Sequence, residues 1–277
     1  MVRWCGSGVV ALLSMAAPAG CSLLVSTDGL SSAAGATAPL DAASESGPGD
    51  AALLDGSTTA DATDGQPAGG FCDSVNPKPT FCADFDTGAL ETFALVGGPT
   101  LDPTFARSPP RSLMAVVEQG AVERFARVEH PLSVSPTYAA VSLQVFLDEY
   151  DAGKDLEIGG LLLKPSNGSS CALFAAVRSG RWTADQYCQT SGTTTASNVG
   201  TSSAAGVMGR WFALTLVLDL EKRHLSLSVD GVIVIDSRPL DAAVVFAPAT
   251  VYVGLAYVSV DATRTRLHVD NLTVEAR

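Results

Sequence analysis

The chain has 277 residues and a formal net charge of −12 at pH 7, with 17 Lys and Arg residues against 29 Asp and Glu residues. An acidic chain without a run of Lys or Arg is poorly suited to bind nucleic acid or to dock electrostatically on anionic lipid. We therefore exclude nucleic acid as a partner and expect any contact with a membrane to depend on an anchor.

Residues 1–20 have the pattern of an export signal. A basic start precedes an apolar run, residues 8–17, that is too short to span a bilayer and is followed by small residues. The Ala-Gly-Cys sequence that ends at Cys21 resembles the lipobox of bacterial lipoproteins, which implies cleavage before Cys21 and acylation of that cysteine. Pro18 stands where this box usually has Leu, and residues 17–19 (Ala-Pro-Ala) also fit an ordinary secretory cleavage site, so free secretion is the alternative.

Residues 21–70 are predicted to be a disordered acidic tether. After Cys21 this segment contains no aromatic residue, Lys or Arg, and its seven acidic residues stand among Ala, Ser, Gly, Thr and Pro. Such a composition cannot bury enough apolar surface to offset the entropy of ordering it. We expect a flexible linker with a reach on the order of 40 Å.

Four cysteines remain after the signal and the anchor, an even number that predicts two disulfides in an exported domain. Two strand-like runs flank residues 179–180 (Ser-Gly), a dipeptide suited to a tight turn. Counting back from this turn places Cys171 opposite Cys188 at a non-hydrogen-bonded pair, where Cα atoms lie about 4.5 Å apart. By elimination, Cys72 pairs with Cys82. A metal site is the disfavoured alternative, because the spacings show no CxxC and no nearby His.

Residues 71–277 are predicted to form one all-β domain, an antiparallel sandwich. Apolar and polar residues alternate in many short runs, and no stretch keeps a 3.6-residue apolar period over three turns. In residues 223–230 the alternation leads into an Asp-Gly turn and a second strand, which predicts a hairpin. The other alternating runs are residues 112–118, 122–129, 138–147, 157–164, 210–220, 251–258 and 265–275. About a dozen short strands suit a jelly roll better than an immunoglobulin sandwich.

Four motifs in this domain carry a family resemblance. They are ADFDTG at residues 83–88, GRWF at 209–212 before an apolar strand, VDG at 229–231 and HVDNLTV at 268–274. Together they resemble concanavalin A-like lectin/glucanase domains, a group that includes laminin G-like and carbohydrate-binding modules. The resemblance covers residues 81–277. It implies the jelly-roll fold, and it indicates function only weakly because this fold hosts many functions.

The resemblance also implies a structural calcium ion where the first and last strands meet. Asp86 and Asp270 occupy the positions that match the acidic ligands of this family. Two carboxylates together with backbone carbonyls supply the hard oxygen ligands that calcium requires. In the alternative interpretation, Asp86 caps a turn and Asp270 pairs with a surface base.

The hairpin around residues 179–180 presents a candidate sugar-binding face. Its register places five residues on one face: Phe174, Arg178, Arg181, Asp185 and Tyr187. The opposite, core-facing set is Cys171, Leu173, Val177, Trp182 and Cys188. The first set combines aromatic platforms with planar polar groups, as sugar binding requires, although an ordinary solvated strand surface has similar residues. Residues 190–209 show no strand pattern and are expected to be a mobile loop.

Catalysis is not expected from the glucanase motif of this family. That motif, Glu-x-Asp-x-x-Glu, uses its outer glutamates as nucleophile and general acid. The nearest match begins at Glu149 and Asp151, but Lys154 stands where the second glutamate is required. The chain also has no G-x-S-x-G motif, and its three histidines are interpreted as structural or solvent-facing.

These features predict an exported cell-envelope lipoprotein with a non-catalytic domain that binds a glycan or a surface partner. Ser22 follows the cysteine where Asp often signals retention in the inner membrane, so the outer membrane is favoured. The alternatives for function are a glycan-cleaving enzyme of the same fold and a structural envelope protein without a ligand.

Overall fold

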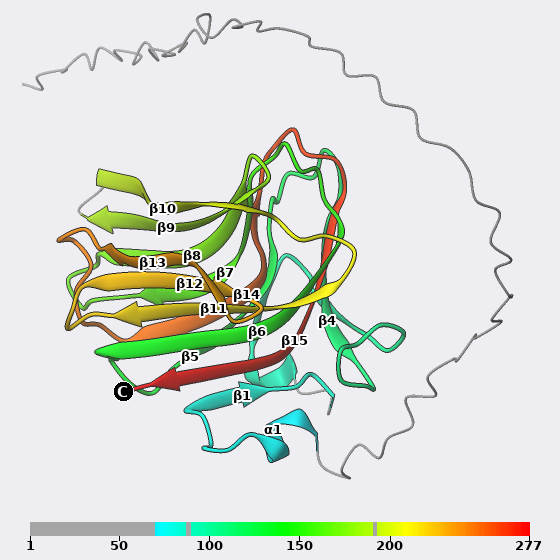
Figure 1. The fold of residues 1–277 in the computed structure, drawn as a ribbon, viewed down its shortest axis with the longest axis horizontal. Helices are drawn as coiled ribbons and strands as arrows, with labels where there is room; N and C mark the ends of the chain where they lie inside the picture. Colours follow the sequence, from blue (N-terminus) through cyan, green and yellow to red (C-terminus); the bar gives the residue numbers. More distant parts are fainter. Residues whose placement is uncertain (1–69, 87–89, 191–192) are drawn as a thin grey trace, which may run out of the picture. The chain divides into compact units, whose positions relative to one another are not determined.

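The alternating runs of the sequence form strands that pair into two antiparallel sheets (Figure 1). The computed structural model describes residues 70–86, 90–190 and 193–277, all of which belong to the unit Asp61–Arg277. The predicted anchor at Cys21 and the predicted tether up to residue 69 lie outside the described residues. Within the described ranges, no helix is long and apolar enough to cross a membrane.

Sheet A has eight strands in the order β13-β12-β11-β6-β15-β4-β3, and β1 pairs with the end of β15 beyond β4. Its strands are β1 (Phe81–Ala83), β3 (Thr100–Asp102), β4 (Ser112–Val117), β6 (Tyr138–Glu149), β11 (Trp211–Asp219), β12 (His224–Val229), β13 (Val232–Pro239) and β15 (Thr265–Ala276). The short helix α1 (Phe71–Ser74) lies beside β1 (Figure 1).

Sheet B has seven strands in the order β10-β9-β8-β7-β14-β5-β2. Its strands are β2 (Ala94–Val96), β5 (Ala126–Pro131), β7 (Leu156–Leu163), β8 (Ser170–Arg178), β9 (Arg181–Thr190), β10 (Thr193–Ala205) and β14 (Ala249–Val258). A single 3-10 turn, η1 (Leu90–Thr92), precedes β2 in the described part of the chain.

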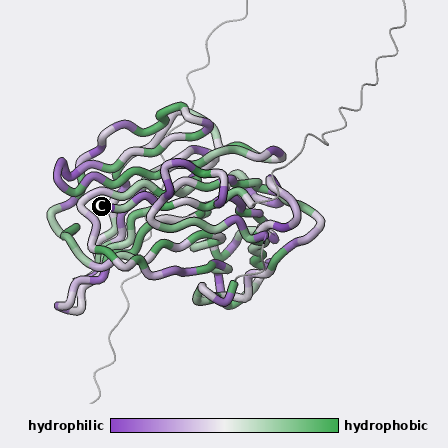
Figure 2. The backbone as a smooth tube through the Cα atoms, turned by 90° about the horizontal axis from the view of Figure 1, so that it is seen from below, coloured by the Kyte–Doolittle hydropathy of each residue, from purple (hydrophilic) through white to green (hydrophobic). Residues whose placement is uncertain are grey.

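The main core lies between the inward faces of the two sheets. Every second residue of β6 and of β11 is buried, as the period-two pattern predicts. Leu113, Val145, Leu216 and Val269 of sheet A belong to the same apolar cluster as Leu161 and Leu173 of sheet B. Apolar segments follow the strands, while polar segments gather at turns (Figure 2). The sandwich therefore follows from one buried face on each sheet.

Two hairpins have the turns that the sequence predicts. Ser179 and Gly180 both have positive φ, as do Asp230 and Gly231. Two successive left-handed residues are typical of a type I′ turn, whose twist suits a two-residue hairpin loop. The observed register pairs Arg178 with Arg181, so the predicted register of the β8–β9 hairpin is confirmed.

Both predicted disulfides are present. Cys171 and Cys188 are direct partners across β8 and β9, with Cα atoms 4.1 Å apart, and their bond lies in the core. Cys72 of α1 is bonded to Cys82 of β1. Two disulfides in one domain indicate folding in an oxidising, extracytoplasmic compartment.

The segment expected to be a mobile loop forms a strand instead. Thr193–Ala205 pairs with β9 as β10, the edge strand of sheet B. Most of its side chains are exposed on both faces, so the sequence shows no alternation of apolar and polar residues. At Gly200 the backbone approaches β13, where an added Cβ would lie 2.8 Å from Ile235. Main-chain pairing with β9, this close approach and the packing of Val199 and Ala204 against the core hold β10 in place.

Candidate functional site

A pocket of about 610 Å³ opens on the face of sheet B that points away from the core. Its floor is a small apolar cluster, distinct from the main core, formed by Phe174, Ala176, Tyr252 and Ala256 with Leu162 and Ala172 packed against it. An adjoining hollow of about 300 Å³ shares Phe174 and Tyr187 with this pocket and extends over β9 and β10. Sheet B thus presents a broad recess with an apolar floor.

Two tyrosines stand exposed at the pocket. Tyr187 of β9 is 45% exposed and Tyr257 of β14 is 38% exposed, and both line the recess. Tyr252 beside them is buried, and burial raises its pKa well above the ordinary value. The pocket therefore combines accessible aromatic surface with an apolar floor.

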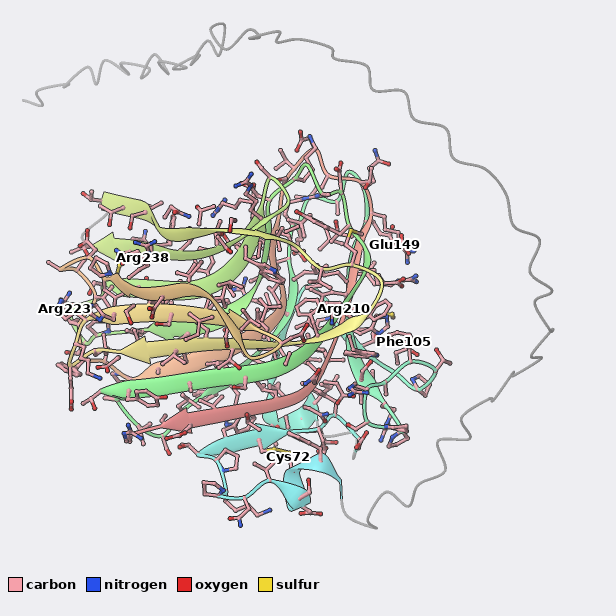
Figure 3. All side chains as sticks on the ribbon, viewed as in Figure 1. Cys72, Phe105, Glu149, Arg210, Arg223 and Arg238 are labelled. Atoms are coloured by element: carbon pink, nitrogen blue, oxygen red, sulfur yellow. A yellow bond between two sulfur atoms is a disulfide. The ribbon has the colours of Figure 1, made fainter. Side chains whose placement is uncertain are left out.

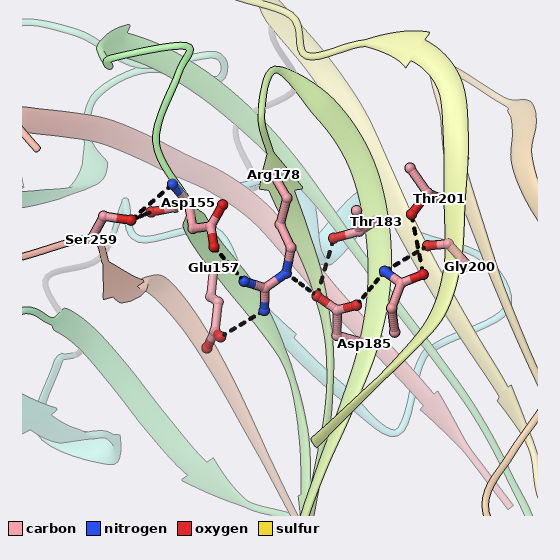
Figure 4. A network of polar contacts seen from close by, with 9 residues as sticks. Asp155, Glu157, Arg178, Thr183, Asp185, Gly200, Thr201 and Ser259 are labelled. Atoms are coloured by element: carbon pink, nitrogen blue, oxygen red, sulfur yellow. Dashed lines mark hydrogen bonds and ion pairs between the residues drawn. The ribbon is translucent and has the colours of Figure 1, made fainter. Parts of the chain in front are cut away.

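Arg178 is the centre of the polar network in the pocket (Figure 4). Its Nε donates to Asp185 Oδ2 at 2.6 Å, and its Nη1 donates to Asp155 Oδ2 at 2.7 Å. Its Nη2 lies 3.6 Å from Glu157 Oε1. One guanidinium group thus connects β8 with β9, with β7 and with the residue that precedes β7.

Asp185 is buried, and both of its carboxylate oxygens accept hydrogen bonds from side chains. Besides Arg178, Thr183 Oγ1 donates to Asp185 Oδ2 at 3.1 Å, and Asn198 Nδ2 donates to Oδ1 at 2.7 Å. The bond from Asn198 ties β10 to the network, and Thr201 of the same strand donates to Asn198 Oδ1 at 3.1 Å (Figure 4). The network holds Arg178 and Asp185 in fixed positions across three neighbouring strands.

A second ion pair borders the pocket on β5. Arg127 Nε donates to Glu129 Oε1 at 2.9 Å, and Arg127 Nη2 lies 2.8 Å from the same oxygen. The guanidinium also contacts the Tyr252 ring, 5.6 Å from its centroid. Arg127 and Glu129 therefore neutralise each other locally.

Glu157 has the most perturbed carboxyl group of the pocket. Burial raises the pKa of Glu157 to about 7, Arg178 opposes this shift, and the negative charges of Asp185 and Asp155 add to it. Its side chain keeps 20% of its surface exposed, so a ligand in the pocket can reach it. Near neutral pH this group exchanges a proton easily.

Irregularities in two strands bring pocket residues into position. In β7 the register shifts between Glu157 and Gly159, so that Ile158 and Leu161, three residues apart, both face the core. In β14 a shift between Val253 and Tyr257 brings Ala256 and Tyr257, adjacent in sequence, to the same pocket. Bulges of this kind re-aim side chains next to functional sites.

Four of the five predicted ligand-binding residues surround the recess. Phe174, Arg178 and Tyr187 line the pocket, and Asp185 lines the adjoining hollow. Phe174 is only 4% exposed and belongs to the floor, so it supports the site rather than offering an open platform. Arg181 is exposed at the end of the hairpin and does not line either hollow.

The sequence did not indicate the residues that other strands contribute. These are Arg127 and Glu129 of β5, Asp155 and Glu157 near the start of β7, Tyr252 and Tyr257 of β14, and Asn198 of β10. Their strands meet through pairings of distant segments, which period-two alternation does not reveal. In the sequence, these residues could have been suspected only because Glu157 is charged and Tyr252 is aromatic, while their neighbours on the same strands are mostly apolar.

Asp86 and Asp270 lie close enough for the negative charge of Asp86 to act on Asp270. Asp270 is fully buried, and its oxygens accept N–H groups of Arg107 and Ser108 at 2.9 Å and of Asn271 at 2.8 Å. Burial raises the pKa of Asp270 to about 6 and also raises that of Asp86. Two neighbouring carboxylates of this kind favour a cation, although the N–H groups already occupy much of Asp270.

No group of three His, Cys, Asp or Glu side chains in the described ranges is arranged to hold a metal ion. A calcium ion bound by Asp86 and Asp270 would need backbone carbonyls or water as its remaining ligands. Calcium binding stays a prediction.

Glu149 and Lys154, the ends of the incomplete glucanase motif, both form ion pairs with other side chains. Glu149, at the end of β6 (Figure 3), lies 2.8 Å from both Arg264 Nη1 and Arg266 Nη2. Lys154 is paired with Asp261 on the surface. The ion pairs of Glu149 are half-buried, and neither Glu149 nor Lys154 lines the pocket on sheet B.

His268, Ser112 and Asp102 meet on sheet A, but not as a nucleophilic triad. Ser112 Oγ, at 3.3 Å, and Asp102 Oδ2, at 3.7 Å, both approach the same ring atom, Nδ1 of His268. A triad needs one partner on each nitrogen. The His268 ring instead packs under Phe105 (Figure 3), whose ring stacks on Trp211. Trp211 thus packs against neighbouring rings on sheet A.

No protein-family model matches the chain, and no curated protein matches it in sequence. Among solved structures, the cellulose-induced protein Cip1 is similar with a TM-score of 0.52 at 13% identity, over 71% of this chain and 97% of Cip1. The fold is a concanavalin A-like β-sandwich.

Two further structures are more distantly similar. A sialidase matches with a TM-score of 0.47 at 14% identity, over 72% of this chain and 19% of the sialidase. A structure described as showing that cell entry of botulinum neurotoxin type C depends on two ganglioside molecules matches with a TM-score of 0.46 at 10% identity, over 67% of this chain and 43% of the matched chain. This chain therefore spans less than half of either matched chain, and at these identities the likeness concerns the fold alone.

The raised pKa of Glu157 predicts a pH-dependent stability. Because the folded-state pKa, about 7, lies above the ordinary value of 4.5, folding favours the protonated form. This contribution is fully present below pH 4.5 and is lost as the pH rises through about 7. Glu157→Gln, which mimics the protonated group, should therefore gain stability over the natural chain at high pH, by on the order of 2 kcal/mol.

Urea unfolding at acidic and at mildly alkaline pH measures this difference. The exposed Asp236→Asn serves as a control of equal charge change on sheet A. If Glu157→Gln differs from the natural chain by the same amount at every pH, the account of Glu157 is wrong.

Calcium is expected to stabilise the folded chain through Asp86 and Asp270. Adding calcium to the chelator-treated chain should raise its melting temperature by several degrees, because a ligand that binds only the folded state stabilises it. Asp86→Asn, which removes one carboxylate and leaves the N–H partners of Asp270 in place, should abolish the shift. No heat of binding and an unchanged melting temperature in the natural chain would remove calcium from this site.

Proposed function

We propose that the outward face of sheet B binds a saccharide and that the domain is a non-catalytic binding module. The observation that carries this proposal is the recess of about 610 Å³, which has an apolar floor, two exposed tyrosines and a fixed polar network. Pyranose rings present apolar C–H faces that pack on aromatic rings, and their hydroxyls are oriented by planar polar groups. Tyr187 and Tyr257 supply the aromatic surface, and Arg178 supplies a planar guanidinium group.

The breadth of the recess favours an extended ligand. The pocket and the adjoining hollow share Glu157, Phe174, Arg178 and Tyr187, so one continuous surface runs from β14 across β7, β8 and β9 towards β10. A chain of several sugar units fits this surface better than a single small molecule does. A surface-exposed partner with similar chemistry is the alternative occupant.

The same chain is proposed to be a cell-envelope lipoprotein anchored through Cys21, in the outer membrane. The lipobox-like sequence before Cys21 and the acidic segment that follows it support this proposal, together with the two disulfides of the domain. A flexible linker lets a tethered module reach immobile polymer in many orientations. Free secretion is the alternative localisation.

One observation favours a second candidate function, cleavage of the bound glycan. Glu157 has a pKa of about 7, as a general acid requires near neutral pH. A glycosidase also needs a second carboxylate that acts on the substrate. The neighbouring Asp155 and Asp185 are instead held by Arg178 at 2.7 and 2.6 Å, which favours binding without cleavage. Release of reducing ends from any bound glycan would support the enzyme instead.

Tyr187→Ala is expected to weaken saccharide binding about tenfold, because it removes an exposed ring that stacks on the sugar. Binding is measured on a glycan array, with and without calcium, and then by calorimetry with the saccharide that the array selects. Phe246→Ala is the matched control, since Phe246 is 55% exposed but does not line the recess. An array that stays blank with well-folded protein, or equal losses in the two variants, would contradict the proposed site.

Cys21→Ala is expected to abolish incorporation of fatty acid into the chain when it is expressed in a bacterium with the lipoprotein pathway. Metabolic labelling with a radioactive fatty acid, followed by separation of membrane and soluble fractions, measures both acylation and anchoring. Cys5→Ala, which alters a cysteine within the signal, is the control. A natural chain that is exported without label would favour ordinary secretion.

A further inference from the structure

The charged groups of the recess do not balance. Of the described residues that line its two hollows, four are carboxylates, Glu129, Asp155, Glu157 and Asp185, and two are basic, Arg127 and Arg178. Arg127 is matched by Glu129. Arg178 contacts the remaining three carboxylates, and Arg127, already paired with Glu129, acts on Glu157 only through its more distant charge. The recess therefore keeps an excess of negative charge over an apolar floor.

Glu157 is the carboxylate with the weakest partner. Asp155 and Asp185 each receive a hydrogen bond from Arg178 of 2.7 Å or less, and Asp185 has further donors. Glu157 has only the 3.6 Å contact with Arg178, and no hydrogen bond to its carboxylate is made by the described residues. Because 20% of its side chain is exposed in the pocket, this missing donor can be supplied by a ligand.

We propose that the saccharide bound on sheet B carries a primary ammonium group, as in an amino sugar without an N-acetyl group, and that this group binds Glu157. This inference rests on the proposed function. The ammonium group supplies both the missing positive charge and up to three donors, and hydrogen bonds between charged partners are stronger than neutral ones. Its sugar ring lies over the floor of Phe174 and Ala256, next to Tyr187.

The same charge pattern disfavours other saccharides. A uronic acid or a sulfated sugar would place a further negative charge next to Asp155, Glu157 and Asp185, and like charges at short range repel. An N-acetylated sugar keeps its ring and hydroxyls but loses the positive charge. Comparison of an amino sugar with its N-acetylated form therefore isolates the interaction with Glu157.

Isothermal titration calorimetry at about pH 6.5 measures the affinity of the purified chain for three β-1,4-linked hexasaccharides. They are the hexamers of glucosamine, of N-acetylglucosamine and of glucose. The glucosamine hexamer should bind about tenfold or more tightly than the other two, the difference expected of a hydrogen bond between charged groups. Glu157→Gln should remove this preference. Asp236→Asn, the control of equal charge change outside the recess, should keep it.

The pH dependence provides a second readout. Glu157 faces Arg178 of β8, Asp185 of β9, Arg127 of β5, Asp155 before β7 and Tyr252 of β14. Because the pKa of Glu157 is about 7, its charged fraction is already partial at about pH 6.5 and almost vanishes at about pH 5. The affinity for glucosamine should therefore fall over this range in the natural chain and change less in Glu157→Gln.

The outcomes separate this inference from the proposed function. Equal affinity for the three hexamers, or a preference for glucosamine that survives Glu157→Gln, overturns the ammonium proposal and leaves saccharide binding in place. Binding of other glycans on the array, with none of the glucosamine hexamer, overturns it as well. A blank array together with three silent hexamers overturns both.

Discussion

The register of the β8–β9 hairpin is the constraint on which the rest of the site depends. Ser179 and Gly180, both with positive φ, close a two-residue turn and thereby fix every pair along the two strands. Cys171 and Cys188 then meet on the core face, while Phe174, Arg178 and Tyr187 come to the opposite face. A slip of one residue would exchange the two faces, placing the disulfide in solvent and the charged residues in the core.

Once the hairpin is fixed, Arg178 links it to the neighbouring strands. Its guanidinium binds Asp185 on β9 and Asp155 before β7, and Asn198 extends the network to the edge strand β10. Charges at this depth need partners, because an unpaired charge with little access to water is costly. Glu157 is less well paired than Asp155 and Asp185, because its only ion contact is with Arg178 at 3.6 Å. The side of the network that faces the pocket therefore lacks a donor for Glu157. The site therefore combines a rigid network around Arg178 with a carboxylate, Glu157, that accepts no hydrogen bond from the described residues.

Much of the fold could be predicted from the sequence, because local patterns determine it. Alternation predicted most strands of the core, although the run 122–129 overlaps β5 only from Ala126. The Ser-Gly and Asp-Gly turns predicted two hairpins. The register of the first hairpin predicted the Cys171–Cys188 disulfide, and elimination then left Cys72–Cys82. The strand β10 was missed because its side chains are mostly exposed on both faces, so its sequence shows no alternation, although its main chain pairs with β9.

The site was predicted only in part, for a physical reason. Residues on one hairpin were identified because their spacing decides their face, as with Phe174 and Tyr187. Arg127, Glu157 and Tyr252 come from strands that pair over long distances in sequence, and two of those strands contain bulges. A bulge breaks the period of two, so no count along the sequence could place Glu157 beside Arg178 or bring Ala256 and Tyr257 to the same pocket.

The location of saccharide binding is tested most directly by NMR of the chain with labelled alanine methyl groups. The floor of the recess contains Ala172 and Ala256, whereas Ala140 and Ala213 lie on the outward-facing positions of β6 and β11 in sheet A. On addition of a saccharide that binds, the account predicts shifts at Ala172 and Ala256 and none at Ala140 and Ala213. Shifts confined to sheet A, with the floor of sheet B unchanged, would contradict it.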